Sequence, residues 1–432
     1  MHGQNWPFYL AEIRRAMAPS TGCTEPTAIA LNAATARKEA RGRLEHITVT
    51  LDPYLYKNAM CVGIPGADER GVALCAAMGA TGGNPDALLC VLEGISAQAV
   101  DAAKALVAAG RVEVKTREDV PGLFIETILQ TDCDAVRVLT LNHHTNIVRV
   151  EHAPFAPYVP GENAHAENPL RACKLSDMVV FAQSVPLGEL DFLREGIEMN
   201  LAVAKAGLKF GLGRAIRTLQ EQGVIGRSPV STAQLLCASA SYARMSGVSL
   251  PVMTATGSGN QGITLLLTLE AVAQERSIPE ETKLRAAALA SLVNIYVKSF
   301  TGTLSAVCAC GVASGLAASV GVVYMLGGDE IAMLGAMKNI LGSISGMICD
   351  GAKEGCANKV ELSSGLAVQA AFLAMQGMSI AEGDGILADG LESLFENLGH
   401  LIREGMQNTN RVIVEIMQGS ATGSRSARDC RS

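Results

Sequence analysis

The sequence predicts an α+β protein, with a mixed N-terminal part that carries a small antiparallel sheet and a larger all-α C-terminal part with glycine-rich buried helices. Apolar residues alternate with a period of two at several places between residues 46 and 152, which is typical of strands. From residue 176 onward the pattern is helical almost throughout. The chain is 49% hydrophobic but only 4% aromatic and has 44 glycines, so we expect closely packed helices with small contact residues.

A chain of 432 residues is long enough for two or three domains. We predict a mixed domain over residues 1–165 and an all-α catalytic domain over residues 170–420. The proline- and glycine-rich stretch at 153–168 is expected to link them. Residues 421–432 are predicted to be a disordered tail.

The N-terminal part begins with a helical pattern that is broken at residues 19–22. Thr24 is then placed to cap a second helix, and Pro26 suits its first turn, so an alanine-rich helix is predicted as far as Ala40. Cys23 therefore precedes a helix N-terminus. The helix dipole at such a position favours an anionic thiolate.

Strands and further helices follow in the mixed part. The strands are predicted from alternation, and the helices from runs of apolar residues at helical spacing. The predicted strands cover residues 46–51, 111–116, 123–131, 135–142 and 146–152, and the predicted helices residues 70–80 and 85–110.

Charge and hydropathy argue against nucleic acid and a membrane as partners. The net charge is −7 and there is no basic run, so nucleic-acid binding has no electrostatic support. Residues 304–328 carry no charge and are long enough to span a bilayer. They contain cysteines, small polar residues and glycines, and acidic residues follow them, so we interpret them as a buried helix region. Residues 1–15 lack the apolar core of a secretory signal, so a cytoplasmic protein is expected.

Twelve cysteines in a chain without an export signal favour metal or catalytic use over disulfides. Three segments place cysteines in glycine-containing turns beside helical runs, namely residues 20–26, 305–313 and 348–359. Backbone N–H groups in such turns can bind sulfides or anions. The spacing matches neither a ferredoxin nor a paired zinc site, and buried cysteine is the default alternative. The other cysteines are expected to be core or surface residues: Cys61, Cys75, Cys90, Cys133, Cys173, Cys237 and Cys430.

These three segments, together with four others, resemble the L-cysteine desulfidase family, which is related to the alpha chain of iron–sulfur L-serine dehydratases. The segments lie in family order, so the resemblance runs from about residue 18 to residue 360. The four others are residues 63–66, 144–148, 195–200 and 257–262, and within the third cysteine segment the match is carried by residues 349–353.

The resemblance implies a [4Fe-4S] cluster held by three cysteines, with one iron left open for substrate. Cys23 and Cys349 match two ligands, and the third falls on Cys308 or Cys310, of which we prefer Cys308; Cys356 is an alternative in the last segment. The implied reaction is elimination of a β-substituent from a small amino acid. L-cysteine would give pyruvate, ammonia and sulfide, L-serine is the alternative substrate, and a non-catalytic iron–sulfur sensor is a third possibility.

Substrate-binding residues are expected in the loop at 257–262, because Ser258, Gly259 and Asn260 combine close backbone approach with side-chain donors. Without a ligand, the same loop is a helix-breaking turn. Lys57 and Asn58 lie in a family-like segment and are further candidates. Asn200, in an apolar helical run with Glu198, is either a substrate contact or a structural partner within the core.

The catalytic base is predicted among histidines and lysines near these segments. His144, beside His143 at a strand end, has an imidazole suited to proton abstraction near neutral pH. Lys298 and Lys353 flank the cysteine segments, as does Lys359, and a buried lysine can serve as a base or hold a carboxylate. Nothing in the sequence identifies a nucleotide loop or a pyridoxal-phosphate site. The apolar all-α half is consistent with a homodimer.

Overall fold

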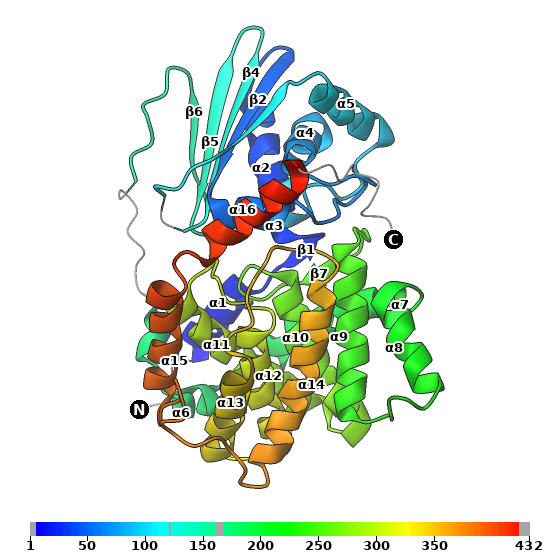
Figure 1. Ribbon diagram of the computed structural model, residues 1–432, viewed down its shortest axis with the longest axis vertical. Helices are drawn as coiled ribbons and strands as arrows, with labels where there is room; N and C mark the ends of the chain where they lie inside the picture. The colour runs from blue at the N-terminus through cyan, green and yellow to red at the C-terminus, as the bar shows by residue number, and fades with distance from the viewer. Residues whose placement is uncertain (1–5, 121, 161–167, 423–432) are drawn as a thin grey trace.

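The computed structural model describes residues 6–120, 122–160 and 168–422, and the predicted α+β class is confirmed (Figure 1). A sheet with helices on one side forms one part of the molecule. A bundle of helices forms the other, and the chain crosses between the two parts several times.

The sheet has five strands in the order β3-β2-β4-β5-β6. Alternate residues of β2, such as Ile47, Val49 and Leu51, are fully buried, which is why the alternation predicted this strand. All pairs are antiparallel except β2 with β3, which run parallel because a long helical connection separates them. The strands are β2 (Leu44–Leu51), β3 (Val112–Thr116), β4 (Phe124–Thr131), β5 (Ala135–Leu141) and β6 (Ile147–His152).

The helices of the sheet part pack their apolar residues against the sheet in one cluster. The single helical run predicted over residues 85–110 is wrong, since a short 3-10 helix and an α-helix divide it. Asn84 and Ser96 each accept a backbone N–H, from Asp86 and Ala99, and so start two separate elements. The elements are α2 (Thr24–Glu39), α3 (Pro53–Ala59), α4 (Val72–Gly82), η1 (Pro85–Cys90) and α5 (Ala97–Ala108).

The bundle surrounds three helices that are buried along nearly their whole length, α10 (Gly259–Arg276), α11 (Glu280–Thr301) and α12 (Val312–Met325). Small residues let these helices approach closely. None of the described helices has the length and apolar character needed to cross a membrane.

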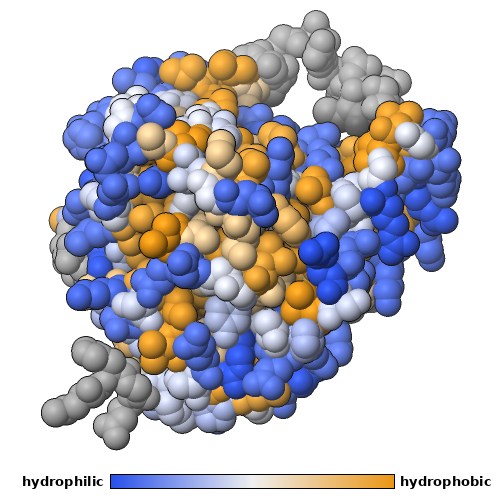
Figure 2. All heavy atoms as spheres, turned by 90° about the horizontal axis from the view of Figure 1, so that it is seen from below, coloured by the Kyte–Doolittle hydropathy of each residue, from blue (hydrophilic) through white to orange (hydrophobic). Residues whose placement is uncertain are grey.

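The remaining bundle elements surround these three helices. Figure 2 looks at the end of the bundle far from the sheet, where apolar and polar side chains alternate over the surface. The elements are η2 (Pro169–Ala172), α6 (Leu175–Ser184), η3 (Leu187–Leu190), α7 (Asp191–Gly207), α8 (Gly211–Glu221), α9 (Pro229–Met245), α13 (Glu330–Ile344), α14 (Cys356–Ala374), α15 (Leu391–His400) and η4 (Leu401–Gly405).

Both ends of the chain tie the two parts together. Helix α1 (Trp6–Ala16) packs in the bundle core, and β1 (Pro19–Thr21) pairs with β7 (Pro251–Met253). Helix α16 (Thr409–Thr422) returns from the bundle to contact α3 (Figure 1). The predicted domain boundary near residue 165 stays a prediction. The predicted tail begins inside α16, and its residues 423–432, like residues 161–167 of the predicted linker, lie outside the described residues.

Candidate active site

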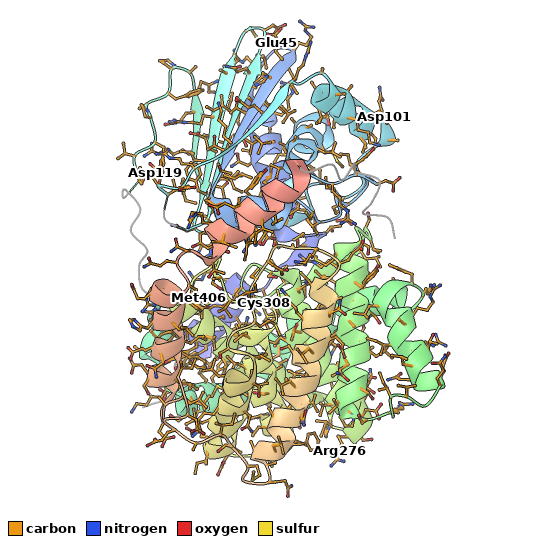
Figure 3. The ribbon with its side chains drawn as sticks, viewed as in Figure 1. Glu45, Asp101, Asp119, Arg276, Cys308 and Met406 are labelled. Carbon is orange, nitrogen blue, oxygen red and sulfur yellow. The ribbon has the colours of Figure 1, made fainter. Side chains whose placement is uncertain are left out.

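Two of the predicted cysteine turns lie side by side through a short antiparallel bridge between Val307 and Ile348. The amide of Cys308 donates to the carbonyl of Met347 at 2.8 Å, and the amide of Cys349 donates to that of Ala306 at 2.7 Å. Figure 3 places Cys308 where the bundle meets the sheet part. Residues 40 positions apart in sequence are thus held together by backbone hydrogen bonds.

The third turn joins them through the side chains of Glu25 and Asn58. The thiol of Cys23 donates to Glu25 Oε2 at 2.9 Å, and Asn58 Nδ2 donates to Glu25 Oε1 at 2.9 Å. The oxygen of the same Asn58 amide accepts from Cys349 Sγ at 3.9 Å. Cys23 and Cys349 therefore lie at the two ends of one chain of contacts. Cys23 precedes α2 as predicted, but it is itself the N-cap residue, so the prediction that Thr24 caps this helix is wrong.

The two alternate cysteines lie at the same place. Cys310 Sγ is 3.5 Å from the hydroxyl of Ser258, and Cys356 packs in one small cluster with Cys23. These contacts bring together the first turns of α2, α10, α12 and α14. Helix N-termini carry partial positive charge, which favours anions. Burial nevertheless raises the pKa of the Cys23 thiol well above its ordinary value, so the prediction that the helix dipole makes Cys23 a thiolate is wrong. The pKa values of Cys310, Cys349 and Cys356 are raised as well.

Lysines add full positive charge around the cysteine turns. Lys57 Nζ donates to the carbonyl of Cys349 at 2.6 Å and also to the Asn410 side chain at the start of α16. Lys359 Nζ donates to the carbonyl of Ile348 at 2.8 Å and pairs with Asp350. Both lysines are held by the backbone of the turn at residues 348–359, Lys57 also by the neutral Asn410 and Lys359 also by the acidic Asp350.

Burial and hydrogen bonding set the protonation of these groups. The pKa of Cys308 is lowered to about 6, chiefly by its hydrogen bond with Cys310 and against the effect of burial, so Cys308 favours a thiolate. Burial lowers the pKa of Lys298 to about 8. It also lowers the pKa of His144, although the nearby Glu25 opposes this shift. His144 is therefore neutral near pH 7, and Lys298 becomes neutral above about pH 8, so either group could accept a proton as a general base.

Comparison with known proteins identifies the family of the chain. The model of the serine dehydratase alpha chain family matches residues 91–415. The chain belongs to this family. A UPF0597 protein of Desulfatibacillum aliphaticivorans is 38% identical over 93% of this chain and 95% of its own length. UPF0597 proteins of Alkaliphilus metalliredigens and Aeromonas hydrophila are 37% and 36% identical, over 94% and 97% of this chain and of their own lengths. The predicted relationship to serine dehydratase alpha chains is thus confirmed, and it supports a dehydratase- or lyase-like function.

The substrate-binding candidates of this family member fall into two groups. Asn260 accepts from the buried guanidinium of Arg244 at 3.2 Å, and Gly257 lies so close to His144 that a Cβ there would be 2.9 Å from Nδ1. These residues line the meeting point of the helices, together with Ser258 and Gly259. Asn200, by contrast, bonds the backbone of Met253 with both amide atoms, at 2.9 and 3.3 Å, and so holds β7 in place.

The two other lysines predicted near the cysteines differ in their surroundings. Lys298 is 7% exposed and donates to the carbonyl of Thr303 at 3.0 Å. The side chain of Lys353 is 35% exposed and forms an ion pair with Asp350. Burial makes Lys298 the better candidate for a neutral amine, because desolvation is what disfavours its charged form.

Sequence reasoning missed Glu25, Arg244 and Asn410. All three are buried polar residues that contact the predicted ones. Glu25 stands two residues after Cys23. Arg244 is the only charged residue of α9, and a single charge in an otherwise uncharged helix could have indicated a functional residue. Asn410 had no comparable signal, since only the return of α16 brings it to the site.

Three cysteines on separate turns are a donor set that a [4Fe-4S] cluster could use. Across the described ranges, no three histidine, cysteine or acidic side chains are grouped closely enough to hold one ion. A lone ion would require sulfurs at about 2.3 Å from one centre. A [4Fe-4S] cluster takes each cysteine on a separate iron, so its ligands stand farther apart. Cys23, Cys308 and Cys349 lie on three separate turns, and Glu25 and Asn58 connect the first of these turns to the last.

Proposed function

We propose that the chain is an iron–sulfur-dependent lyase that removes a β-substituent from a small amino acid, with L-cysteine as the first candidate. The observation that carries the proposal is the convergence of three cysteine turns, through Glu25 and Asn58, on the starts of four helices. Membership of the serine dehydratase alpha chain family supports the reaction type.

Cys23, Cys308 and Cys349 would hold the [4Fe-4S] cluster, with Cys310 and Cys356 as alternates within the same group. When bound, the cluster supplies a Lewis acid that makes the thiol or hydroxyl of the substrate a better leaving group. Thiol ligands of this kind need reducing surroundings, which is why cytoplasmic placement belongs to the proposal.

The protein's own groups would bind the substrate and move its α-proton. The first turn of α10, with Ser258, Gly259 and Asn260, offers N–H groups for the substrate. Lys298, with a pKa of about 8, would take the α-proton as a neutral amine, and His144 is the competing base. Loss of the proton from Cα and of hydrosulfide from Cβ gives 2-aminoacrylate. This species becomes an imine and is hydrolysed, so L-cysteine and water yield pyruvate, ammonia and hydrogen sulfide without any change of redox state.

L-serine is the second candidate substrate, and the matched family favours it by name. The same proton transfer would then release hydroxide in place of hydrosulfide. The two substrates differ only in the atom that leaves, so the positions of Lys298 and the α10 turn serve both.

The test is a substrate screen on protein purified and reconstituted without oxygen, following pyruvate, ammonia and sulfide. We expect L-cysteine or L-serine to give one pyruvate for each ammonia, and we expect sulfide from L-cysteine alone. Cys349→Ala should lose the activity, whereas Cys133→Ser, an exposed cysteine outside the site, should keep it. A cluster-loaded protein that forms no keto acid from either amino acid would contradict the proposal and favour the sensor.

A further inference from the structure

Arg244 is a buried cation with an unused hydrogen-bonding group. It is 2% exposed, although it belongs to a residue type that is almost never fully buried unless paired. Its Nε donates to the carbonyl of Gly22 at 2.9 Å and its Nη1 to Asn260 Oδ1 at 3.2 Å. The third nitrogen, Nη2, is buried and has no hydrogen-bond partner among the described residues.

The charge of Arg244 is not neutralised by a direct ion pair. Among the ion pairs formed by the described residues, none includes Arg244, and both of its hydrogen-bond acceptors are neutral oxygens. An unpaired charge in a protein interior is strongly unfavourable. The Glu25 carboxylate acts on this charge through space without contacting it, so Arg244 Nη2 stays open to an anion that lies directly against the guanidinium.

The start of α10 provides the second half of an anion site. Gly259, its first residue, lies so close to the guanidinium that a Cβ there would be 2.3 Å from Arg244 Nε. Ser258, the N-cap residue, makes no side-chain cap hydrogen bond, and its hydroxyl turns to Cys310 instead. The first-turn N–H groups of this 18-residue helix thus lack the usual cap beside an unsatisfied arginine.

We propose that Arg244 binds the carboxylate of the substrate and thereby restricts this site to carboxylic acids. That the carboxylate belongs to an amino acid rests on the proposed function. The carbonyl of Gly22 that fixes Arg244 is adjacent to Cys23, and Asn260 lies in the loop that also carries Ser258. A carboxylate held here has its Cβ substituent within the group of cysteine turns. The planar fork of arginine suits two-point binding of a carboxylate, which a lysine cannot reproduce.

The binding test uses ligands that the enzyme does not convert, measured by calorimetry on anaerobically purified protein. 3-Mercaptopropionate keeps the thiol and carboxylate of cysteine without its amine, and cysteamine keeps the thiol and amine without the carboxylate. We expect 3-mercaptopropionate to bind and cysteamine to bind at least about 30-fold more weakly. Equal affinities, or no binding of 3-mercaptopropionate to the wild-type protein, would overturn the assignment.

Variants of Arg244 test the same assignment independently of the ligand series. Arg244→Gln and Arg244→Lys should each weaken 3-mercaptopropionate binding by at least about 30-fold and raise KM more than they lower kcat. The control is Arg276→Gln, an exposed residue in the last turn of α10, which should bind as the wild type does. Unchanged binding by a folded Arg244→Lys protein would remove the role.

The outcomes separate this inference from the proposed function. Binding of 3-mercaptopropionate that depends on Arg244, without pyruvate from either amino acid, keeps the carboxylate site and removes the elimination. Pyruvate formation by Arg244→Gln with an unchanged KM keeps the elimination and removes the carboxylate site.

Discussion

Helices α10, α12 and α14 begin at the junction with the sheet and end at the far side of the bundle. The two ends differ in whether their buried polar groups have hydrogen-bond partners. At the junction, Arg244 Nη2, His144 Nε2 and Asn410 Nδ2 are buried without a hydrogen-bond partner among the described residues. Buried polar groups are normally paired, so these three atoms give the junction donors that a ligand can use.

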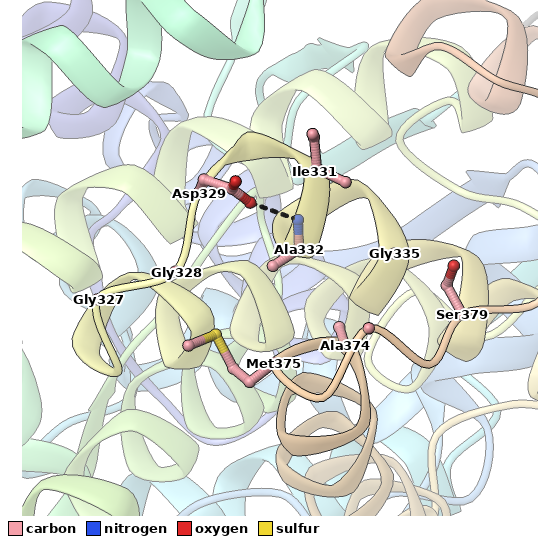
Figure 4. Close-up of a pocket in the computed structure, with 10 residues that line it drawn as sticks. Gly327, Gly328, Asp329, Ile331, Ala332, Gly335, Ala374, Met375 and Ser379 are labelled. Atoms are coloured by element: carbon pink, nitrogen blue, oxygen red, sulfur yellow. Dashed lines mark hydrogen bonds between the residues drawn. The ribbon is translucent and has the colours of Figure 1, made fainter.

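The far end has hollows but no such groups among the residues that line them. One hollow of about 400 Å³ lies between the loop after α12 and the end of α14 (Figure 4). Its acidic residue, Asp329, is already used, because it caps α13 by accepting the amide of Ala332 at 2.9 Å. A second hollow of about 430 Å³ is mostly apolar, with Leu373 and Arg276 on its edge.

The comparison teaches that unsatisfied buried polar groups indicate a functional site more directly than the size of a hollow does. A hollow whose polar side chains already have hydrogen-bond partners offers a ligand few groups to bind. The junction offers directional donors and positive helix ends in a dry setting, where such groups act most strongly. Substitutions at the junction should therefore change activity, and those at the far end should change only stability.

The largest effect is expected from Lys298→Met. Removing a general base costs about 10²- to 10⁴-fold in rate. Because the pKa of Lys298 is about 8, its neutral form prevails above that pH, so kcat/KM of the wild type should rise up to about pH 8 and then level off. The variant should lose that rise. Lys353→Met, at the partly exposed lysine, should keep it; the opposite result would transfer the role to Lys353.

Glu25→Gln should lower kcat/KM by about 10- to 100-fold. The carboxylate accepts from Cys23, Thr24 and Asn58, and a glutamine amide must turn a donor toward one of them. The lost contact costs about 1–3 kcal/mol and loosens the tie between the cysteine turns.

The measurement for Glu25→Gln is iron per chain together with kcat/KM. The matched control is Glu270→Gln, an equally buried glutamate farther along α10 that pairs with Lys283. It should lose stability but keep both iron and activity. Equal losses of activity in the two variants would contradict the claim that only substitutions at the junction change activity.

Asn410→Ala should have a smaller effect, about 10-fold on kcat/KM, with a free energy of unfolding lower by about 1–2 kcal/mol. Asn410 is 3% exposed and accepts from Lys57, which also bonds the carbonyl of Cys349. Urea unfolding and steady-state kinetics measure both quantities. Asn408→Ala, at an exposed position just before α16, should leave kcat/KM unchanged.

Asp329→Ala should change stability alone. Loss of this N-cap of α13 should lower the free energy of unfolding by about 1 kcal/mol without altering kcat/KM. Asp329→Asn keeps a capping oxygen and should restore the urea midpoint. A change in activity of more than about threefold would show that the far end takes part in function.

The sheet could be predicted from sequence because its pattern is local. Each predicted strand lies within about two residues of the observed one, since burial of one face imposes alternation. The short helix α3 was not predicted, although Asp52 caps it by accepting from Tyr54 and Leu55. Seven residues are too few for a helical period to be recognised.

The site could be predicted only in part. The cysteine turns are readable because cysteine in a glycine turn is distinctive, whereas their partners depend on pairings over long separations. The pairing of β1 with β7 and the return of α16 bring in Arg244 and Asn410 from distant segments. No local pattern encodes such pairings. The homodimer stays a prediction.

The most direct test of the central claim is the iron and acid-labile sulfide content after anaerobic reconstitution. The account predicts about four irons and four sulfides per chain in the wild type and in Cys133→Ser, with both lost in Cys23→Ala and in Cys349→Ala. Full iron and sulfide in either of these last two variants, or a wild-type chain that holds no cluster, would contradict it.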